Sequence, residues 1–364
     1  MGREATTPTF GRTTFSAPAP DGTIAAPMLA IKNHTPFTSA IVPGLDKEGF
    51  DTATVVVKGT FALGGARLSI AAEQAPISYG DEHFGDPAFS SVKRESDTCP
   101  AKRGTDVVLT GHAYAPHRGV ESVDVALAAG PVRKVVRVFG DRAWFRSLGS
   151  YSMSDPLPFD RVPLIYERAF GGTDTEGANP ANHGVERRNP VGAGFSTGPN
   201  GKPIEGLVLP NLEDPAALIE SPEDRPEPAG FGFTGRGWSP RASYAGTYDE
   251  AWKAARFPFL PDDFDERYFQ GAHPDLICAA PLRGGEQVLV QNASDLGELR
   301  FALPTVALSI TARIKGVAAE HVPRLDTVQI EPDERRVVLS WRTTFRCPRT
   351  FVYIDDIVIR ETRR

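Results

Sequence analysis

The stretch TVVVKGTF, residues 54–61, decides the fold class of this chain. Valine and threonine carry two heavy atoms on Cβ and favour extended strands over helices. The glycine pair Gly64-Gly65 follows, and after it comes a second extended stretch, RLSI, at residues 67–70. Two such stretches separated by a glycine turn are typical of a β-hairpin. The sequence therefore predicts antiparallel β structure in the first part of the chain.

Stretches of the same character recur on both sides of the middle of the chain. In Val306, Leu308 and Ile310, and again in Val337 and Leu339, apolar side chains alternate with polar ones. Each strand would then have one apolar and one polar face, as antiparallel sheets packed face to face require. We expect strands at residues 107–114, 123–128, 132–139, 144–145, 287–292, 299–303, 306–314, 327–330, 336–345 and 351–360.

The middle of the chain, residues 156–286, shows neither a helical nor a strand period and is rich in glycine, proline, arginine and aspartate. Its many aromatic side chains argue against disorder, so we expect an ordered assembly of loops. Two short helices are predicted there. One spans residues 214–219 with Asp214 as its N-cap, and the other starts at a capping box over residues 247–250 and ends before Pro258.

These patterns divide the chain into four parts. We expect a flexible tail at residues 1–26, an N-terminal antiparallel β region at 27–153, a loop-rich segment at 154–285 and a C-terminal β region at 286–364. The last region either stands alone or completes one sheet with the N-terminal region. The predicted fold class is mainly β, with antiparallel β-sandwich-like regions at both ends and a long loop-rich, weakly helical central segment.

Charge and composition narrow the range of functions. The net charge is −6 and lysine and arginine form no basic stripe, so we expect no nucleic-acid binding. The three cysteines, Cys99, Cys278 and Cys347, include no close pair, which predicts reduced thiols without disulfides or a CxxC zinc site. The N-terminus lacks an apolar leader, and no apolar run reaches the ~18 residues of a membrane helix. We therefore expect a cytoplasmic protein with no membrane partner.

Two motifs match patterns found in enzymes. GFSTG, residues 194–198, fits the G-x-S-x-G nucleophile elbow with Ser196 as the nucleophile, a geometry that needs a strand before the serine and a helix after it. Pro190 and Pro199 flank the motif, so that helix is not predicted. GFGFTG, residues 230–235, fits the dinucleotide-binding pattern but also lacks the required strand and helix. We therefore expect no catalytic residue and no cofactor.

A third enzymatic candidate is a group of aspartates near one histidine. Carboxylates beside a histidine can hold a metal ion or transfer protons, but only where folding brings them together. In proline-rich loops, aspartates more commonly form helix caps and Asx turns, and we expect that role and no metal site. The group consists of Asp249, Asp262, Asp263, Asp265, Asp275 and His273.

Arginine, acidic and aromatic side chains are dense in the central segment. Because loops lack ladder hydrogen bonds, arginine–carboxylate pairs and stacking on rings can brace them. Candidates for bracing are Glu167, Arg168, Arg241, Asp249, Arg256, Asp265 and Arg267, with the rings of Tyr166, Trp238, Tyr248 and Trp252. Protein interfaces are also rich in arginine and aromatic residues, so this segment is a candidate partner-binding surface. The residues predicted to build it are Arg168, Phe170, Tyr248, Asp249 and Trp252.

Several blocks of this segment, in this order, resemble a bacterial family that is labelled a domain of unknown function. The blocks are YERAFGG at 166–172, NPVGAGF at 189–195, PAGFG at 228–232, AGTYD at 245–249 and LPDDFD at 260–265. The similarity extends over residues 35–304 and includes residues 105–115 and GDRAW at 140–144. Phe233, Gln270 and Gly285 depart from the family's usual residues. Members of the family are encoded beside type VI secretion genes.

The resemblance implies a non-enzymatic adaptor or chaperone, since members of the family are regarded as adaptors for toxic effectors. The implied partners are a toxin effector protein and the VgrG and PAAR proteins of the secretion spike. One alternative is a hydrolase that uses Ser196 or the Asp/His group. Another is a structural component of the spike, which would require a repetitive β-helical sequence, and the chain has no such repeat.

Overall fold

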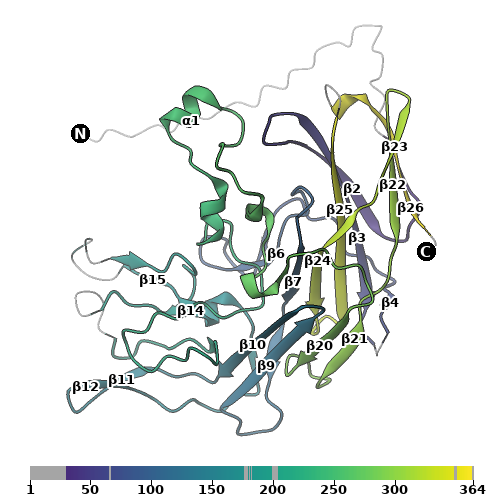
Figure 1. The fold of residues 1–364 in the computed structure, drawn as a ribbon. Coiled ribbons are helices and arrows are strands. Elements are labelled where there is room, and N and C mark those ends of the chain that lie inside the picture. Colours follow the sequence, from purple (N-terminus) through teal and green to yellow (C-terminus); the bar gives the residue numbers. More distant parts are fainter. Residues whose placement is uncertain are drawn as a thin grey trace, which may run out of the picture.

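A computed structural model shows that the protein is mainly β, as predicted (Figure 1). The structure describes residues 30–64, 67–175, 179, 181, 183–198, 204–347 and 351–362, so the tail predicted at residues 1–26 lies outside the described residues. Within these ranges the single α-helix is α1 (Glu250–Ala255). No helix there is long and apolar enough to cross a membrane. The 3-10 helices are Tyr166–Arg168, Arg241–Ala245, Glu266–Phe269, Pro274–Leu276 and Phe351–Tyr353.

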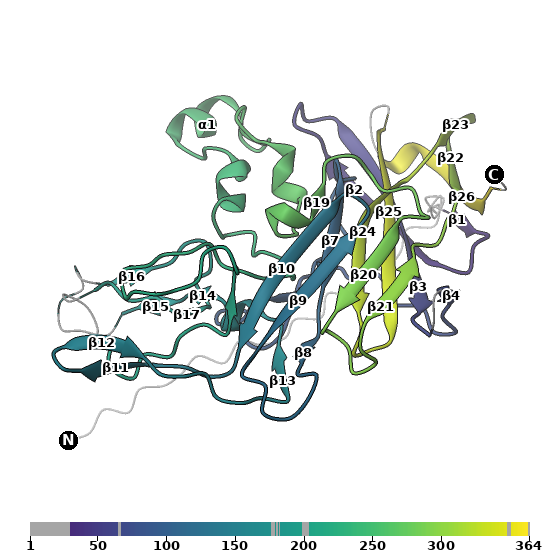
Figure 2. The same ribbon diagram turned by 60° about the horizontal axis from the view of Figure 1, so that its bottom comes forward.

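The largest sheet joins strands from both ends of the chain (Figure 2). Its spatial order is β19-β7-β24-β25-β3-β2, and β4 pairs with the end of β3. The central pair, β3 with β25, places Val57 opposite Trp341. The bounds are β2 Thr38–Leu45, β3 Asp51–Ala62, β4 Ser69–Ile70, β7 Thr105–Leu109, β19 Ile277–Cys278, β24 Arg324–Glu331 and β25 Arg336–Arg346.

Two further sheets pack with the largest one around a shared apolar core. The five-stranded sheet has the order β18-β10-β9-β20-β21, and the four-stranded sheet has the order β1-β26-β22-β23. The bounds of the first are β9 Ser122–Ala129, β10 Val132–Phe139, β18 Leu212–Glu213, β20 Gln287–Gln291 and β21 Leu299–Ala302. Those of the second are β1 Ala30–Asn33, β22 Leu308–Ile314, β23 Val317–His321 and β26 Ile354–Glu361.

Short two-stranded pairs make up most of the remaining β structure. Two of these pairs lie wholly within the central segment, which is loop-rich and weakly helical as predicted. The pairs are β5 Glu82–His83 with β6 Val92–Arg94, β8 His112–Tyr114 with β13 Arg161–Pro163, β11 Trp144–Ser147 with β12 Ser150–Met153, β14 Phe170–Gly171 with β17 Ala193–Gly194, and β15 Thr173–Asp174 with β16 Gly184–Val185.

Most strand pairs are antiparallel, as expected, but three pairs of described strands are parallel: β7 with β24, β1 with β26 and β14 with β17. Hairpins join antiparallel neighbours, whereas parallel neighbours need a longer connection. The parallel pairs join strands from separate parts of the chain. The side-chain pattern of a single strand does not show whether it will pair in a parallel or an antiparallel manner.

The predicted hairpin after β3 is present, because β4 pairs antiparallel with the end of β3. Both faces of β3 are buried. Val55, Val57 and Phe61 belong to the apolar core. Lys58 and Thr60 lie on the opposite face and are covered by the loop that follows β4, where the Lys58 ammonium donates to the Pro76 carbonyl. The polar face of this strand is therefore buried inside the protein.

One of the two predicted helices forms. The N-cap of α1 is Asp249, whose carboxylate accepts a hydrogen bond from the Trp252 amide at 2.8 Å. The predicted capping box, with Thr247 as N-cap, is therefore wrong. The Thr247 amide and hydroxyl both donate to the carboxylate of Asp263, at 2.9 and 2.7 Å. The hydroxyl expected to cap the helix therefore binds a residue outside it. The helix ends before Pro258, as predicted.

The helix predicted for residues 214–219 does not form. The Asp214 carboxylate accepts from the Ala216 amide at 2.8 Å, which makes a local turn. The Ile219 amide donates to the buried carboxylate of Glu213 at 2.8 Å instead of to a helical carbonyl. The prediction fails because a buried charged group takes a backbone donor that a helix would need.

Among the strands of three or more residues in the three large sheets, β1, β2 and β23 had no clear sequence signal. β2 contains Pro43 and Gly44, which normally argue against a strand. It tolerates them because it is the last strand of its sheet, and a proline without an N–H group fits an edge.

Candidate functional site

The structure places the five predicted surface residues in two separate regions. Tyr248, Asp249 and Trp252 lie together in and beside α1. Arg168 and Phe170 lie in the layer of short strands around β14. Both views show α1 well apart from β14, so the five residues do not form one contiguous surface (Figures 1 and 2).

Arg168 and Phe170 hold the loop layer together. The Arg168 guanidinium donates to the side-chain oxygen of Asn211 at 3.0 Å and contacts the carboxylate of Asp141 at 3.2 Å. Phe170 is 1% exposed and packs in a small apolar cluster with Trp144 and Leu209. Arg168 therefore braces this layer, and Phe170 fills its core.

The segment that contains α1 forms an arm on the body of the protein, and we call residues 240–269 the aromatic arm (Figure 1). At its tip the ring centroid of Trp252 lies 4.8 Å from that of Tyr248 and 5.6 Å from that of Phe257. The Trp252 indole N–H donates to the Phe259 carbonyl at 2.9 Å. Tyr248 is 50% exposed and Phe257 is 67% exposed. The tip therefore exposes large aromatic side chains to water, and the hydrogen bond of Trp252 helps to hold them in place.

Hydrogen bonds join the outer part of the arm to the turn between β2 and β3. The Arg256 guanidinium donates to the carbonyl of Lys47 at 2.6 Å. In return, the Lys47 ammonium donates to the Phe264 carbonyl at 3.1 Å. A Cβ atom built on Gly49 would lie 2.7 Å from the Phe259 ring, which shows how closely the ring approaches the turn. The arm is thus held at its far end as well as at its base.

A groove runs between the aromatic arm and the β2–β3 hairpin. It consists of two adjoining hollows of about 630 and 320 Å³. The walls shared by both hollows are Leu45, Asp46, Thr52, Pro100, Leu260 and Phe269. Charged pairs border the larger hollow, including Arg103 with Glu266 at 2.6 Å and Arg346 with Asp46 at 2.5 Å. We call this feature the arm groove.

The aspartates proposed as a metal or proton-transfer group mostly serve as caps and ion-pair partners of the arm. Asp249 caps α1, and Asp263 binds Thr247. Asp265 binds the Arg267 guanidinium at 2.6 Å, a hydrogen bond that lowers the pKa of Asp265. No group of three potential metal ligands occurs in the described part of the chain.

His273 and Asp275 lie elsewhere, in a separate pocket of about 570 Å³ next to β10. The Asp275 carboxylate binds the buried ammonium of Lys134 at 2.8 Å, and the Asp275 amide donates to His273 Nδ1 at 3.2 Å. Burial and the nearby Lys134 charge lower the pKa of His273 to about 4. Tyr166 lines the same pocket, and burial raises its pKa. His273 is therefore neutral near pH 7, in a pocket apart from the arm.

Ser196 is 3% exposed. Its hydroxyl accepts a hydrogen bond from the Gly198 amide at 3.2 Å, and its carbonyl accepts one from Arg225 at 2.7 Å. β17 ends two residues before it, and the described residues that follow, Thr197 and Gly198, are not helical. This geometry differs from a nucleophile elbow, in which a helix follows an exposed serine.

The glycines of residues 230–235 make room for aromatic rings. Cβ atoms built on Gly230 and Gly235 would lie 2.7 Å from the ring of Tyr166 and 2.6 Å from that of Trp238, respectively. Phe231, between them, is fully buried in the core. Packing of side chains explains this motif without a nucleotide.

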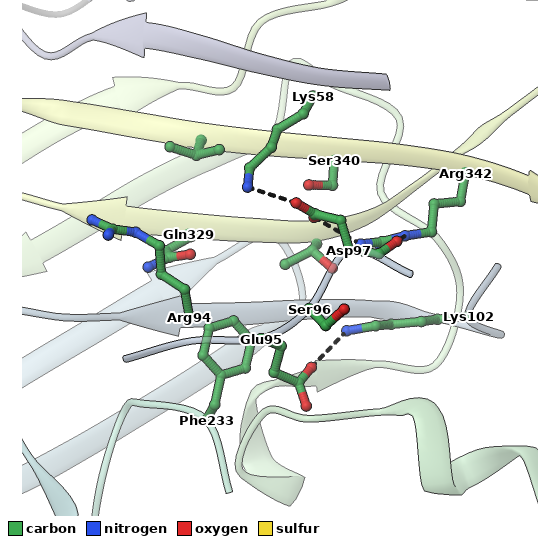
Figure 3. Close-up of a pocket in the computed structure, with 12 residues that line it drawn as sticks. Lys58, Arg94, Glu95, Ser96, Asp97, Lys102, Phe233, Gln329, Ser340 and Arg342 are labelled. Carbon is green, nitrogen blue, oxygen red and sulfur yellow. Dashed lines mark hydrogen bonds and ion pairs between the residues drawn. The ribbon is translucent and has the colours of Figure 1, made fainter. Parts of the chain in front are cut away.

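A network of buried charges lies against the largest sheet (Figure 3). Asp97 binds the ammonium of Lys58 at 2.7 Å and the guanidinium of Arg342 at 3.0 Å. Arg342 also binds Asp326. Figure 3 shows Lys58 and Arg342 reaching Asp97 from neighbouring strands around a cavity of about 20 Å³, close to the volume that one water molecule needs.

The same network continues to the arm. Lys102 binds Asp106 at 2.5 Å and Glu95 at 3.4 Å, and Glu95 binds Arg241 at 2.6 Å. Burial acts to lower the pKa of Lys102, but the charges of Asp106 and Glu95 outweigh burial and raise it above its ordinary value. Arg241 lies at the start of the arm and also donates to the Tyr268 carbonyl at 2.9 Å. The network therefore fixes the base of the arm to the sheet.

Sequence reasoning missed most of this network. It contains four cations and four carboxylates, each with a side chain at most 8% exposed: Lys58, Lys102, Arg241 and Arg342, with Glu95, Asp97, Asp106 and Asp326. The equal numbers of opposite charges allow each charge to be compensated where water is excluded. One signal in the sequence pointed to it, the lysine in the middle of the strand TVVVKGTF.

Comparison with known proteins gives one finding about relatives. A family model described as an uncharacterized protein conserved in bacteria (DUF2169) matches residues 48–342. The match covers most of the largest sheet, together with the central segment and the aromatic arm. No curated protein and no solved structure matches the chain.

Proposed function

We propose that this chain, which belongs to the bacterial family DUF2169, is a non-enzymatic adaptor that binds a toxic effector protein and helps load it on a type VI secretion spike. The partners would be the effector and the VgrG and PAAR proteins of the spike. The adaptor would act in the cytoplasm, before the effector leaves the cell. The resemblance of the central blocks suggests this role, and the aromatic arm provides a structure suited to it.

The observation that carries the proposal is the exposed aromatic surface of the arm. Tyr248 and Phe257 expose half or more of their surface, although they are packed on Trp252. Interface hot spots are enriched in aromatic residues that are rigid before binding, because little conformational entropy is then lost. An arm fastened at its tip and base meets that condition.

The arm groove adds a second element of recognition. Its apolar floor includes Leu260 and Phe269, and paired charges line its rim. An extended segment of the effector with apolar side chains would fit there beside the exposed aromatic tip. Together, the tip and the groove offer the apolar centre and polar rim found in protein interfaces.

The hydrolase alternative receives less support from the geometry. A serine nucleophile must reach its substrate and lie near a base. Ser196 is buried, and the aspartates of the Asp/His group are divided between the arm and the pocket that contains His273. These placements favour binding over catalysis.

The test is co-purification with the product of the adjacent toxin gene. The chain should form a stable complex with this protein and raise its level in the cell, because bound folded protein is protected by mass action. Substituting Phe257→Asp should lower the affinity about 10-fold or more, since a charge would have to be desolvated at the centre of the contact.

The matched control is Phe145→Asp. Phe145 is 44% exposed and lies on β11, far from α1 in both views (Figures 1 and 2). This variant should bind as the unmodified chain does. Equal loss of binding in both variants would exclude the arm as the contact surface. Folded protein that captures neither toxin nor spike protein from its native lysate would overturn the adaptor function itself.

A further inference from the structure

A second surface, distant from the arm, is the outer edge of β23. This strand ends the four-stranded sheet, and no other strand of the described chain pairs with its outer side. Its residues are largely exposed, with Val317 at 70% and the adjoining Val322 at 74%. A free strand edge offers unpaired N–H and C=O groups to another chain.

The hairpin turn determines where the hydrogen-bonded pairs fall. β22 and β23 are joined by Lys315 and Gly316, whose φ angles are 50° and 79°, as in a type I′ turn. A two-residue turn closes with a hydrogen-bonded pair, here Ile314 and Val317. From that pair onward, bonded and non-bonded pairs alternate along the ladder.

The alternation shows which backbone groups are free. Val317, Ala319 and His321 direct their N–H and C=O groups to β22, in the pairs that contain Ile314, Ala312 and Ile310. Ala318 and Glu320 therefore direct theirs outward, to the free edge.

β23 is five residues long and carries Glu320, but its edge has no proline, lysine or bulge to block pairing. Exposed edges are commonly blocked by proline, lysine or a bulge. β2, an edge strand of the largest sheet, contains Pro43. β23 has the sequence VAAEH, with neither proline nor lysine. Its register with β22 is regular over all five pairs.

We propose that β23 pairs in an antiparallel manner with β23 of a second copy of this chain, around a twofold axis at Ala319. Ala318 then forms a hydrogen-bonded pair with Glu320 of the second copy, and the axis repeats this pair. Each pair exchanges two N–H···O=C bonds, so every outward group of these residues finds a partner. The two four-stranded sheets become one continuous sheet.

Side chains along this register are compatible with the pairing. Ala319 faces Ala319 of the second copy in a non-bonded pair, where strands approach to about 4.5 Å and a small side chain fits. Arg313, next to Ala318 in the β22–β23 register and half exposed, lies on the side that Glu320 of the second copy approaches. Ala318 lies between these two residues on the same face, so the nearby charges are opposite, and the twofold axis repeats the arrangement.

The contact between the two β23 strands involves few residues, so the association should be weak. Stable dimers usually bury ~1,200 Å² or more, and two residues of free backbone on each chain provide less. We therefore expect self-association that depends on protein concentration in the micromolar range. It would leave the arm free to bind a partner.

The test is sedimentation velocity of the full chain from low to high micromolar concentration. The mass should rise from 39.3 kDa towards twice that value. Ala318→Pro removes an outward N–H group and no bond to β22, so it should keep the chain monomeric at every concentration. Ala319→Lys places like charges directly opposite one another at the axis and should have the same effect.

The matched control is Leu148→Lys, which adds the same charge at the fully exposed tip between β11 and β12. This variant should dimerise as the unmodified chain does, and unchanged circular dichroism of each variant shows that it is folded. A chain that is monomeric throughout the range would overturn the proposal. So would a dimer that persists in both β23 variants, or one that only Leu148→Lys disrupts.

Discussion

At the scale of single residues, His273 shows how burial changes the chemistry of a side chain. Burial lowers its pKa to about 4, and the positive charge of Lys134 acts in the same direction. Asp275 and Asp214 act in the opposite direction but do not outweigh them. In the unfolded chain a histidine has a pKa near ~6.5. The folded protein therefore binds fewer protons than the unfolded chain between these two pKa values.

This difference predicts a pH dependence of stability. The contribution of His273 is fully present above pH ~6.5 and is lost as the pH falls towards 4, by at most roughly 3 kcal/mol. His273→Gln cannot be protonated and should lose less stability between pH 7 and pH 4.5. Urea unfolding at both pH values measures the effect, and comparison of the two proteins cancels the contribution of other groups. An equal loss in both would show that His273 is already charged in the folded protein.

At the scale of elements, the aromatic arm depends on a contact that has no sequence pattern. Gly49 has a φ of 85° in the turn between β2 and β3, and a Cβ atom added there would lie 2.7 Å from the ring of Phe259. A side chain at this position would push the ring away and loosen the outer part of the arm.

The prediction is that Gly49→Ala increases hydrogen exchange in residues 250–260. Gly119→Ala is the matched control, because Gly119 has a φ of 82° but no atom near the position of its Cβ. Both variants should lose about 1–2 kcal/mol from placing alanine in the left-handed region. Only Gly49→Ala should also increase exchange in the arm, as exchange measured by mass spectrometry would show. Identical exchange in the two variants would mean that the ring moves aside without cost.

At the scale of the whole molecule, the buried charge network links parts of the chain that are far apart in sequence. Lys58 comes from β3 and Arg342 from β25, while Asp97 comes from the loop between β6 and β7. Each partner compensates a charge that water cannot reach. The network holds this loop on the sheet and, through Arg241, holds the arm on the loop.

Removing one member should therefore be costly. Asp97→Ala leaves Lys58 and Arg342 without their shared carboxylate, and we expect a loss of about 3–5 kcal/mol in the free energy of unfolding. Asp124→Ala removes the exposed partner of Arg137 and should cost less than about 1 kcal/mol. Denaturant unfolding of both variants measures the difference. Equal losses would contradict the proposed importance of this network.

Local signals predicted those features that depend on neighbours in the sequence. The valine-rich stretch at residues 132–139 predicted β10, and Pro258 correctly limited the end of α1. The start of α1 could not be predicted, because Thr247 binds Asp263 across the arm. For the same reason, the sequence could name Tyr248 and Trp252 as part of a surface but could not show that Phe170 is buried elsewhere.

The sequence by itself determined that the protein is mainly β, where most strands of the three large sheets lie and which central segment is loop-rich. These features follow from strand and turn preferences, which act between residues close in the chain. Only the tertiary structure decided that β3 pairs with β25, that β7 runs parallel to β24 and that Lys58 meets Asp97. These choices depend on contacts between distant residues. The pattern of one strand does not specify which other strand or loop will cover it.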